Sequence, residues 1–95
     1  MDKVDLFPDH SRCMKCGSTY WLEQHHIFPG ALRNKSERYG AVVTLCHSCH
    51  NEPPKGVHHC QKEMEMWKAE AQRRIMNEKG WTKEQFIASF YKSYI

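Results

Sequence analysis

The pattern of apolar and polar positions predicts two short strands in the first half of the chain. Residues 19–27 (TYWLEQHHI) are rich in β-branched and aromatic side chains, and residues 41–45 (AVVTL) form a short apolar run. A Pro-Gly pair and a later glycine indicate a loop over residues 28–40. The pattern therefore predicts an antiparallel hairpin. Residues 1–12 show little pattern, and we expect them to form a loose arm.

The second half changes to a helical pattern. Over residues 61–79 apolar side chains recur at spacings of three, four and four, which is typical of an amphipathic helix. These side chains are Met64, Trp67, Ala71 and Ile75. Gly80 supplies a stop signal, and Thr82 with Gln85 forms a capping-box pair at the start of a final helix. We interpret the two helices as a hairpin that completes the core, and we expect a further short helical turn around His50.

The length and charge of the chain narrow the classes of protein. Ninety-five residues predict a single domain over 1–95, in which a modest core needs an additional cross-link. The net charge of +3 and a pI near 8.6 are compatible with a nucleic acid as partner but do not require one. No apolar run has membrane-spanning length, and the first residues lack a signal-peptide pattern. We therefore expect no membrane association and a cytoplasmic location.

Cysteine and histidine are unusually frequent and clustered. The chain has five Cys and seven His, and six of the seven His lie between His25 and His59. In a reducing compartment such clusters favour metal ligation over disulfides. Two CxxC pairs, separated by 29 residues, can present four sulfurs to one tetrahedral ion. Their cysteines, Cys13, Cys16, Cys46 and Cys49, therefore predict a structural zinc site, whereas Cys60 is expected to be buried or inert.

The histidines follow these cysteine pairs closely. His25 and His26 are neighbours in the first strand, so their side chains should point to opposite faces and serve different purposes. With both CxxC pairs on one ion, the hairpin would bring these histidines near His50, and His58 and His59 follow a few residues later. The sequence predicts a second cluster of imidazoles beside the zinc. Solvent exposure is the expectation for His10 and His47.

At "LEQHHI" and "LCHSCH" the sequence resembles the HNH (ββα-metal, or His-Me finger) endonucleases. The longer pattern "HHIFPGALRNKSERYG…LCHSCH…GVHH" is similar to small HNH-type proteins encoded by phages and prophages. The resemblance covers residues 13–59 well and the helical tail at 61–95 more weakly. It implies an α+β fold, namely a zinc-stabilised ββα-metal motif with a C-terminal helical hairpin.

The resemblance also implies a role for each histidine. His25 and His50 would bind a catalytic divalent ion, with His58 preferred to His59 as a third ligand. His26 would be the general base, since a neutral imidazole, which titrates near pH ~6.5, can accept a proton at cytoplasmic pH. The ion, which could be Mg²⁺, Mn²⁺, Ni²⁺ or Zn²⁺, would stabilise charge on the scissile phosphate.

One position departs from the family pattern. The middle asparagine of the motif, whose carbonyl orients the base histidine, is replaced here by Ala41. A backbone carbonyl at Gly40 or Ala41 could still accept the His26 N–H, because any residue has one. Asn34 could supply the missing side chain, although its spacing does not match the family.

The segment "RNKSERYG" carries three basic residues, Arg33, Lys35 and Arg38. Near a metal site they could bind the phosphate backbone, but an ordinary solvated polar loop is an equally good interpretation. The function that the sequence favours is metal-dependent hydrolysis of phosphodiester bonds in DNA with low sequence specificity, and RNA is left open. The alternative is a non-catalytic zinc module that binds DNA or a phage or host replication or recombination protein.

Overall fold

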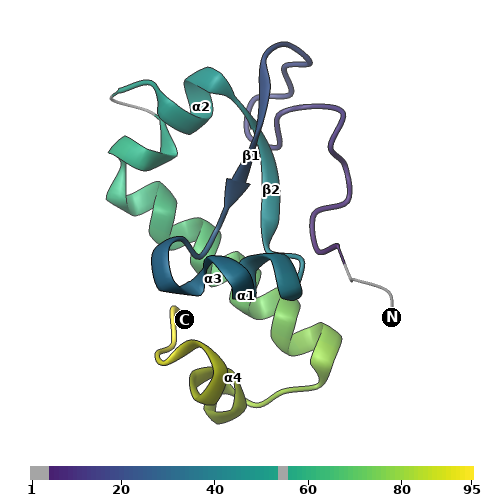
Figure 1. The fold of residues 1–95 in the computed structure, drawn as a ribbon, viewed down its shortest axis with the longest axis vertical. Coiled ribbons are helices and arrows are strands. Elements are labelled where there is room, and N and C mark those ends of the chain that lie inside the picture. Colours follow the sequence, from purple (N-terminus) through teal and green to yellow (C-terminus); the bar gives the residue numbers. More distant parts are fainter. Residues whose placement is uncertain (1–4, 54–55) are drawn as a thin grey trace.

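The computed structural model describes residues 5–53 and 56–95, and it shows a two-stranded sheet surrounded by helices (Figure 1). The elements are β1 (Leu22–His26), the 3₁₀ helix η1 (Gly30–Leu32), α1 (Arg33–Arg38), β2 (Val42–Cys46), α2 (His47–Asn51), the 3₁₀ helix η2 (Val57–His59), α3 (Gln61–Lys79) and α4 (Lys83–Phe90). The α+β class predicted from the sequence is confirmed.

Strands β1 and β2 pair antiparallel, as predicted, with His25 opposite Val43 and His26 opposite Val42. Strand β1 is shorter than the predicted strand because Trp21 has a φ of 51°, a left-handed conformation that interrupts an extended chain. Strand β2 begins and ends one residue later than predicted. The register fixes which side chains of the hairpin face α2 and which face α1.

The prediction of a loop over residues 28–40 is wrong, because η1 and α1 occupy most of this segment. The side chains of α1 are almost all polar, so the segment has no apolar stripe from which a helix could be recognised. Its one buried residue is Ser36, whose hydroxyl accepts from the Phe28 N–H at 2.7 Å and donates to the Phe28 carbonyl at 2.9 Å. Helix α1 is thus held against the end of β1 by hydrogen bonds and not by apolar packing.

The expectation of a loose N-terminal arm is also wrong for the described residues from Asp5 onward. Leu6 and Phe7 are buried, and Phe7 packs edge-on against Trp67 with 5.7 Å between ring centroids. Arg74 donates to the Leu6 carbonyl at 2.6 Å and lies over the Phe7 ring. Two apolar side chains among polar ones are too few to give a periodic signal. Residues 1–4, which were part of the same prediction, lie outside the described residues.

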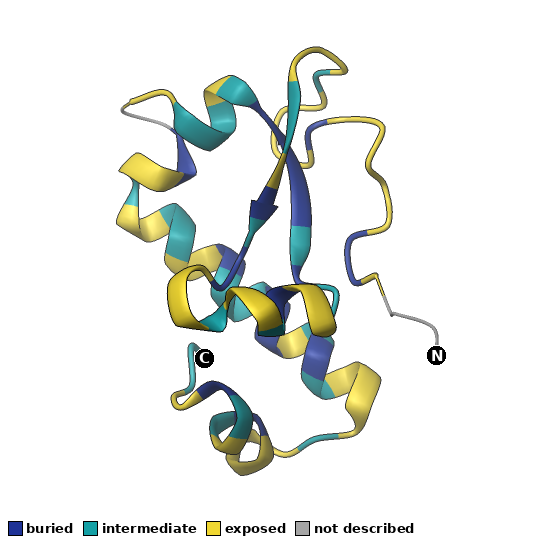
Figure 2. Cartoon of the chain, in the orientation of Figure 1, coloured by how far each residue is buried: buried dark blue, intermediate teal, exposed yellow. Residues whose placement is uncertain are grey.

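Helix α3 has the predicted bounds and lies across the hairpin (Figure 1). Trp67, Ala71 and Ile75 are buried, as the apolar stripe predicts, whereas Met64 is half-buried. Gly80 ends the helix with a φ of 65°, which glycine adopts without steric cost. The stripe therefore faces the core, which is dark blue around β2 and α3 in Figure 2.

The final helix α4 begins with the predicted capping box, in which Thr82 and Gln85 bond to each other's backbone N–H. It ends at Tyr91, which has a φ of 73°. The segment that follows returns to α3, where the buried amide of Gln72 donates to the Ser93 hydroxyl and accepts from the Tyr94 N–H. Within the described residues, no helix is long and apolar enough to span a membrane.

Candidate metal centre

Four thiols meet at the end of the hairpin where β2 runs into α2. Cys13 and Cys16 belong to a tight turn in which the Gly17 N–H donates to the Cys13 carbonyl at 2.9 Å, while Gly17 has a φ of 83°. The Met14 N–H donates to the Thr44 carbonyl and so fixes this turn beside β2, which carries Cys46. Cys49 follows on the first turn of α2. All four Sγ atoms lie within 4.8 Å of one another.

The thiols of this cluster differ in the direction in which their pKa values are shifted. Burial raises the pKa of Cys13, but backbone N–H groups of Cys16, Cys46 and Lys15 directed at its sulfur outweigh burial and lower the pKa well below that of a free thiol. Burial, followed by the neighbouring sulfurs, raises the pKa of Cys49. The lowered pKa of Cys13 favours its thiolate form, whereas the raised pKa of Cys49 favours its protonated form unless a cation binds beside it.

The spacing of the sulfurs fits a zinc ion. A tetrahedral ion with Zn–S bonds of about 2.3 Å separates its sulfurs by about 3.8 Å. The Sγ atoms of Cys16 and Cys46 are 3.6 Å apart. The cluster could hold a structural zinc, and Cys60, which is half-buried before α3, does not belong to it.

Three imidazoles form a second cluster below the thiols. Ring nitrogens of His25 from β1, His50 from α2 and His58 from η2 lie within 4.8 Å of one another. The Nε2 atoms of His50 and His58 are 2.9 Å apart, close to the separation of about 3 Å between adjacent nitrogens on one ion when each bond is about 2.1 Å and the bonds meet at a right angle. The structure thus brings together the three histidines expected as ligands, and His59 is not in this cluster.

His25 is the buried member of the imidazole cluster, with 2% of its surface exposed. Burial, followed by the charges of His50 and His58, lowers its pKa from 6.5 to about 3. Burial and the charges of His50 and His59 also lower the pKa of His58. Neutral imidazoles have a lone pair for a metal, so the local environment keeps His25 in the form that can bind an ion.

Glu23 is a residue of the site that the sequence analysis missed. Its Oε1 accepts from His50 Nδ1 at 2.7 Å and from the Asn51 amide at 2.9 Å, and its Oε2 accepts from His47 Nδ1 at 2.9 Å. Hydrogen bonds from His50 and His47 lower the pKa of Glu23. With its Nδ1 proton held by this carboxylate, His50 directs Nε2 toward the cluster, as carboxylates do for many metal-binding histidines.

A signal for Glu23 exists in the sequence, because residues two apart on a strand share a face and Glu23 precedes His25 by two. The same contact overturns the expectation that His47 is simply solvent-exposed. Its ring also stacks on Trp21, with 4.0 Å between centroids and 7° between planes. His10 is exposed as expected, although its ring contacts Thr44 and Asp5.

His26 faces α1 and not the imidazole cluster. Its Nε2 lies 3.0 Å from Glu37 Oε1. Among the described residues the His26 ring has no hydrogen bond to a carbonyl of Gly40 or Ala41, so that expectation is not met; these carbonyls accept from the N–H groups of Leu6 and Ile27. Glu37, on the segment expected to be a loop, is therefore the partner of the His26 ring, whereas Asn34 is exposed on α1.

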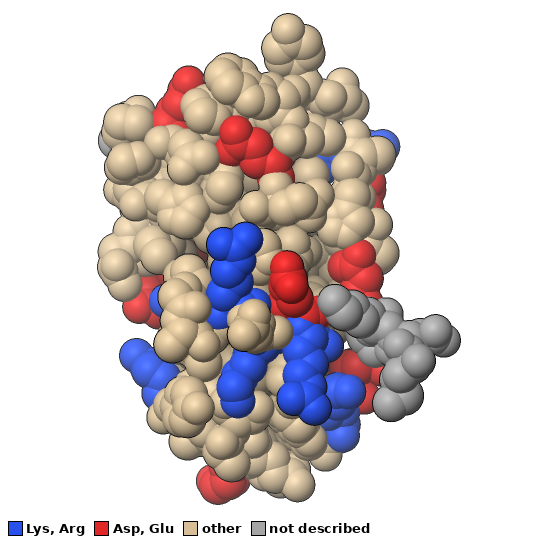
Figure 3. Space-filling view, viewed as in Figure 1, with Lys and Arg blue, Asp and Glu red and all other residues tan. Residues whose placement is uncertain are grey.

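The basic residues of α1 differ in accessibility. Arg33 and Arg38 are exposed, whereas Lys35 is half-buried and its ammonium donates to the carbonyl and hydroxyl of Ser89. In the view of Figure 3, Lys and Arg side chains gather in the lower half of the molecule, over and below α1.

Arg33 also borders an open cleft of about 240 Å³ at the imidazoles. The cleft is lined by Gln24, His25, His26, Arg33, His50 and His58, together with residues of the following turn.

Two antiparallel strands followed by a helix, with imidazoles from the first strand and the helix beside a four-thiol cluster, define a ββα-metal arrangement. Residues 13–55 match the family model for HNH endonuclease. The resemblance to HNH endonucleases is thus confirmed for this segment, and the match suggests nuclease-type activity with metal binding. Comparisons with curated proteins and with solved structures found no match.

Proposed function

We propose that the protein is a metal-dependent endonuclease that hydrolyses phosphodiester bonds in DNA with low sequence specificity. One observation carries the proposal: a single cleft is lined by three converging imidazoles, by a further histidine paired with a carboxylate, and by an arginine. These are the groups that phosphodiester hydrolysis needs, namely a cation site, a base and a phosphate-binding charge. The HNH match over residues 13–55 supports the same conclusion.

Two metals have separate roles in this proposal. Zinc at the four cysteines is structural, because four thiolates leave no position open for a substrate. His25, His50 and His58 would hold the catalytic ion. A divalent ion bound there would supply positive charge to stabilise the scissile phosphate and the leaving oxygen. Glu23 orients His50 from behind through Nδ1.

His26 acts as the general base. Its Nε2 proton is held by Glu37, so Nδ1 is the nitrogen that takes the proton of the attacking water. The adjacent carboxylate fixes the plane of the ring and stabilises the imidazolium that results, as the acid of a catalytic triad does. His25 and His26 therefore divide the work, with one ring for the metal and the other for the water.

Arg33 and Arg38 hold the DNA backbone. Arg33 borders the cleft, and both side chains are exposed on α1. Contacts of arginine with phosphates give affinity without reading sequence, which accounts for the proposed low specificity. Lys35 contributes less to this surface because Ser89 already engages its ammonium.

A plasmid-nicking assay tests the function directly. Wild-type protein is incubated with supercoiled DNA and Mg²⁺, Mn²⁺ or Ni²⁺, beside His26→Ala and the matched control His59→Ala, whose ring lies outside the imidazole cluster. We expect His26→Ala to cleave about 10²–10⁴-fold more slowly, the usual effect of losing a positioned general base. It should still bind DNA, and His59→Ala should cleave like wild type.

One observation favours a non-catalytic zinc module that binds DNA or a replication or recombination protein. Ala41 replaces the asparagine expected from the family, and both backbone groups of Ala41 are engaged, by Ser36 and Ile27. On this alternative, wild-type protein binds DNA and leaves it intact with every ion tested. The relation to phage-encoded proteins remains a prediction from the sequence pattern.

A further inference from the structure

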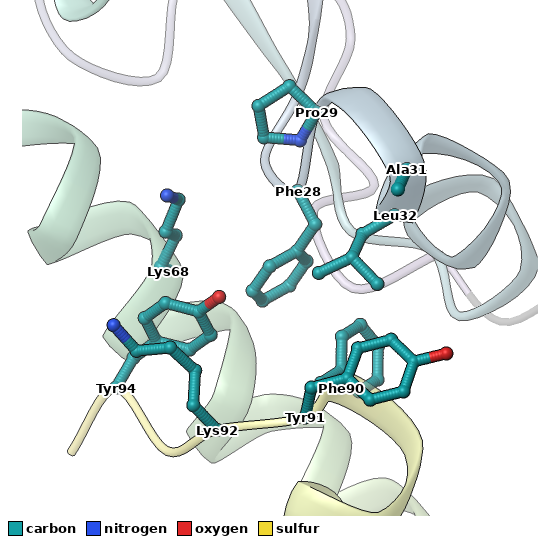
Figure 4. Close-up of a pocket in the computed structure, with 9 residues that line it drawn as sticks. All are labelled: Phe28, Pro29, Ala31, Leu32, Lys68, Phe90, Tyr91, Lys92 and Tyr94. Carbon is teal, nitrogen blue, oxygen red and sulfur yellow. The ribbon is translucent and has the colours of Figure 1, made fainter.

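A second pocket, of about 430 Å³, lies next to the cleft and has no role in the proposed chemistry (Figure 4). Its volume is in the range of about 300–1,000 Å³ that is typical of small-ligand sites. Pro29 borders both the pocket and the cleft, and Phe28, a wall of the pocket, follows His26 by two residues. A ligand that filled both the cleft and the pocket would therefore extend from the proposed catalytic residues into this pocket.

The walls of the pocket are aromatic. Phe28 and Phe90 are fully buried, with their ring centroids 4.8 Å apart, and Tyr94 packs on Phe28 at 5.5 Å. Tyr91 also lines the pocket, although 73% of its surface is exposed. Phe28 and Phe90 support the pocket from beneath, and the accessible rings of Tyr91 and Tyr94 favour a flat ligand, since rings stack with offset faces.

Two ammonium groups lie at one side of this aromatic pocket. Lys68 from α3 and Lys92 from the C-terminal segment both approach the Tyr94 ring, with Nζ at 5.4 and 5.1 Å from its centroid. Figure 4 shows both amino groups on the side of the pocket away from Leu32 and Tyr91. Within 5–53 and 56–95, neither lysine forms an ion pair with a carboxylate, although the charge of Glu65 acts on Tyr94. The pocket thus combines an apolar, flat interior with a cationic edge.

Tyr91, whose ring lines the pocket, has a strained backbone conformation. In the described part of the chain, Trp21 and Tyr91 are the only residues other than glycine with positive φ. A bulky side chain in this conformation is destabilising, and glycine would end α4 without that cost. Most of the Tyr91 ring stays in solvent, and Lys35 Nζ lies over it at 5.3 Å from its centroid.

We propose that the aromatic pocket binds the base of an unpaired nucleotide next to the scissile phosphate, with Lys68 and Lys92 on the phosphate of that nucleotide. The inference rests on the proposed nuclease function and adds a substrate preference, for DNA with a single-stranded stretch at the cut. Base stacking on aromatic side chains tolerates any sequence, because every base has a flat face. A paired base is stacked within its own duplex and is not available to the pocket.

Binding of short oligonucleotides tests this without cleavage. The affinity of the zinc-loaded protein is measured by fluorescence anisotropy, with no added divalent ion, for a thymidine octamer, an abasic octamer of equal charge and a blunt duplex. We expect wild type to bind the thymidine octamer about five-fold more tightly, or more, than the abasic one, because stacking is worth about that much per base. Tyr91→Ala should remove most of this difference and leave duplex affinity unchanged.

Matched variants separate stacking from general damage. Tyr91→Phe keeps the ring and should keep the preference. Tyr20→Ala removes another exposed tyrosine, which precedes β1 and does not line the pocket, and should also keep it. Lys92→Ala should reduce the slope of log affinity against log salt by about 0.7 for single strands, whereas Lys83→Ala on α4 should reduce it less.

Equal affinity of wild type for the thymidine and abasic octamers would overturn the inference, and so would an unchanged preference in Tyr91→Ala. The failures of the two proposals are distinguishable. Cleavage without a base preference rejects the pocket and retains the nuclease. A base preference that Tyr91→Ala removes, in a protein that never cleaves, retains the pocket and rejects the nuclease.

Discussion

His26 on β1 and Glu37 on α1 are in contact through their side chains, with Nε2 and Oε1 3.0 Å apart. The contact links the last residue of β1 to a short polar helix, and it makes the carboxylate the partner of the ring proposed as general base. A carboxylate on one nitrogen of an imidazole sets its tautomer and leaves the other nitrogen to accept a proton. Glu37 therefore contacts the ring for which the family pattern led us to expect a backbone carbonyl.

Replacing this carboxylate should slow cleavage without weakening DNA binding. We expect Glu37→Gln to lower kcat by about 10–100-fold, the usual cost of losing such an orienting partner, with KM nearly unchanged. Glu78→Gln, at an exposed position of α3, is the matched control. Steady-state cleavage of a fluorescent oligonucleotide gives both constants. If Glu37→Gln and Glu78→Gln cleave equally fast, Glu37 does not orient the base.

The four-cysteine cluster should hold one zinc per chain, on which folding depends. Cys46→Ser removes a buried sulfur of the cluster, whereas Cys60→Ser changes a thiol outside it. We expect Cys46→Ser to lose both zinc and cooperative thermal unfolding, since binding energy at such a site is folding energy. Cys60→Ser should retain both. Metal analysis after dialysis without chelator, followed by calorimetry, checks this, and a folded zinc-free Cys46→Ser protein would contradict it.

A second, weaker metal should bind at the imidazoles. His58→Ala and His59→Ala make a matched pair of neighbouring exposed histidines, of which His58 alone lies in the cluster. We expect His58→Ala to weaken binding of Ni²⁺ or Mn²⁺ by at least about ten-fold and His59→Ala to leave it unchanged. Isothermal titration of the zinc-loaded protein measures both. The reverse order of effects would move the third ligand to His59.

Parts of this structure follow from local sequence signals. The bounds of α3 are predictable because an apolar stripe and Gly80 mark them, and the proximity of the four cysteines follows from the CxxC spacing. Helix α1 is not predictable in this way, because it is held by Ser36 and not by an apolar face.

The contacts of Glu23 and Glu37 are harder to foresee for a different reason. Glu23 contacts His50, which is 27 residues away in the sequence, and Glu37 contacts His26, which is 11 residues away. Charged residues are usually solvated, so their type alone carries no signal for such a contact. Only the strand register and the position of α1, which depend on the whole fold, bring these partners together.

The pKa of His25 predicts how stability depends on pH. The unfolded chain takes up a proton near pH 6.5, but His25 in the folded protein does so only at about 3. Acid therefore favours the unfolded state, so this contribution is complete above pH 6.5 and is lost as the pH falls toward 3. Between about pH 7.5 and about pH 5.5, we expect wild type to lose about 1 kcal/mol more than His25→Asn.

Urea unfolding of zinc-loaded protein at the two pH values measures this difference. Any stability that is lost because zinc is released at low pH is lost in both wild type and His25→Asn. His59→Asn is the control, because its ring is exposed and lies outside the imidazole cluster. It should stay closer to the wild-type pH dependence than His25→Asn does, because the charge of His59 contributes only to the pKa shift of His58. An identical decrease for wild type and His25→Asn would show that His25 is not held neutral by the fold.

Introducing the asparagine of the family pattern at position 41 should not increase the rate of DNA cleavage. Ala41 is fully buried, its N–H donates to the Ser36 carbonyl at 2.7 Å, and its carbonyl accepts from Ile27 at 3.0 Å. Ala41→Asn would insert a larger polar side chain into the core at a cost of about 1–3 kcal/mol, which corresponds to a decrease in Tm of roughly 5 °C or more for a chain of this size. Ala88→Asn, at an exposed position of α4, is the control and should lower Tm less. If Glu37 orients His26, as proposed, Ala41→Asn should not cleave faster than wild type at temperatures where it is folded. A stable Ala41→Asn protein that cleaves DNA faster than wild type would show that the asparagine is needed after all and that Glu37 does not replace it.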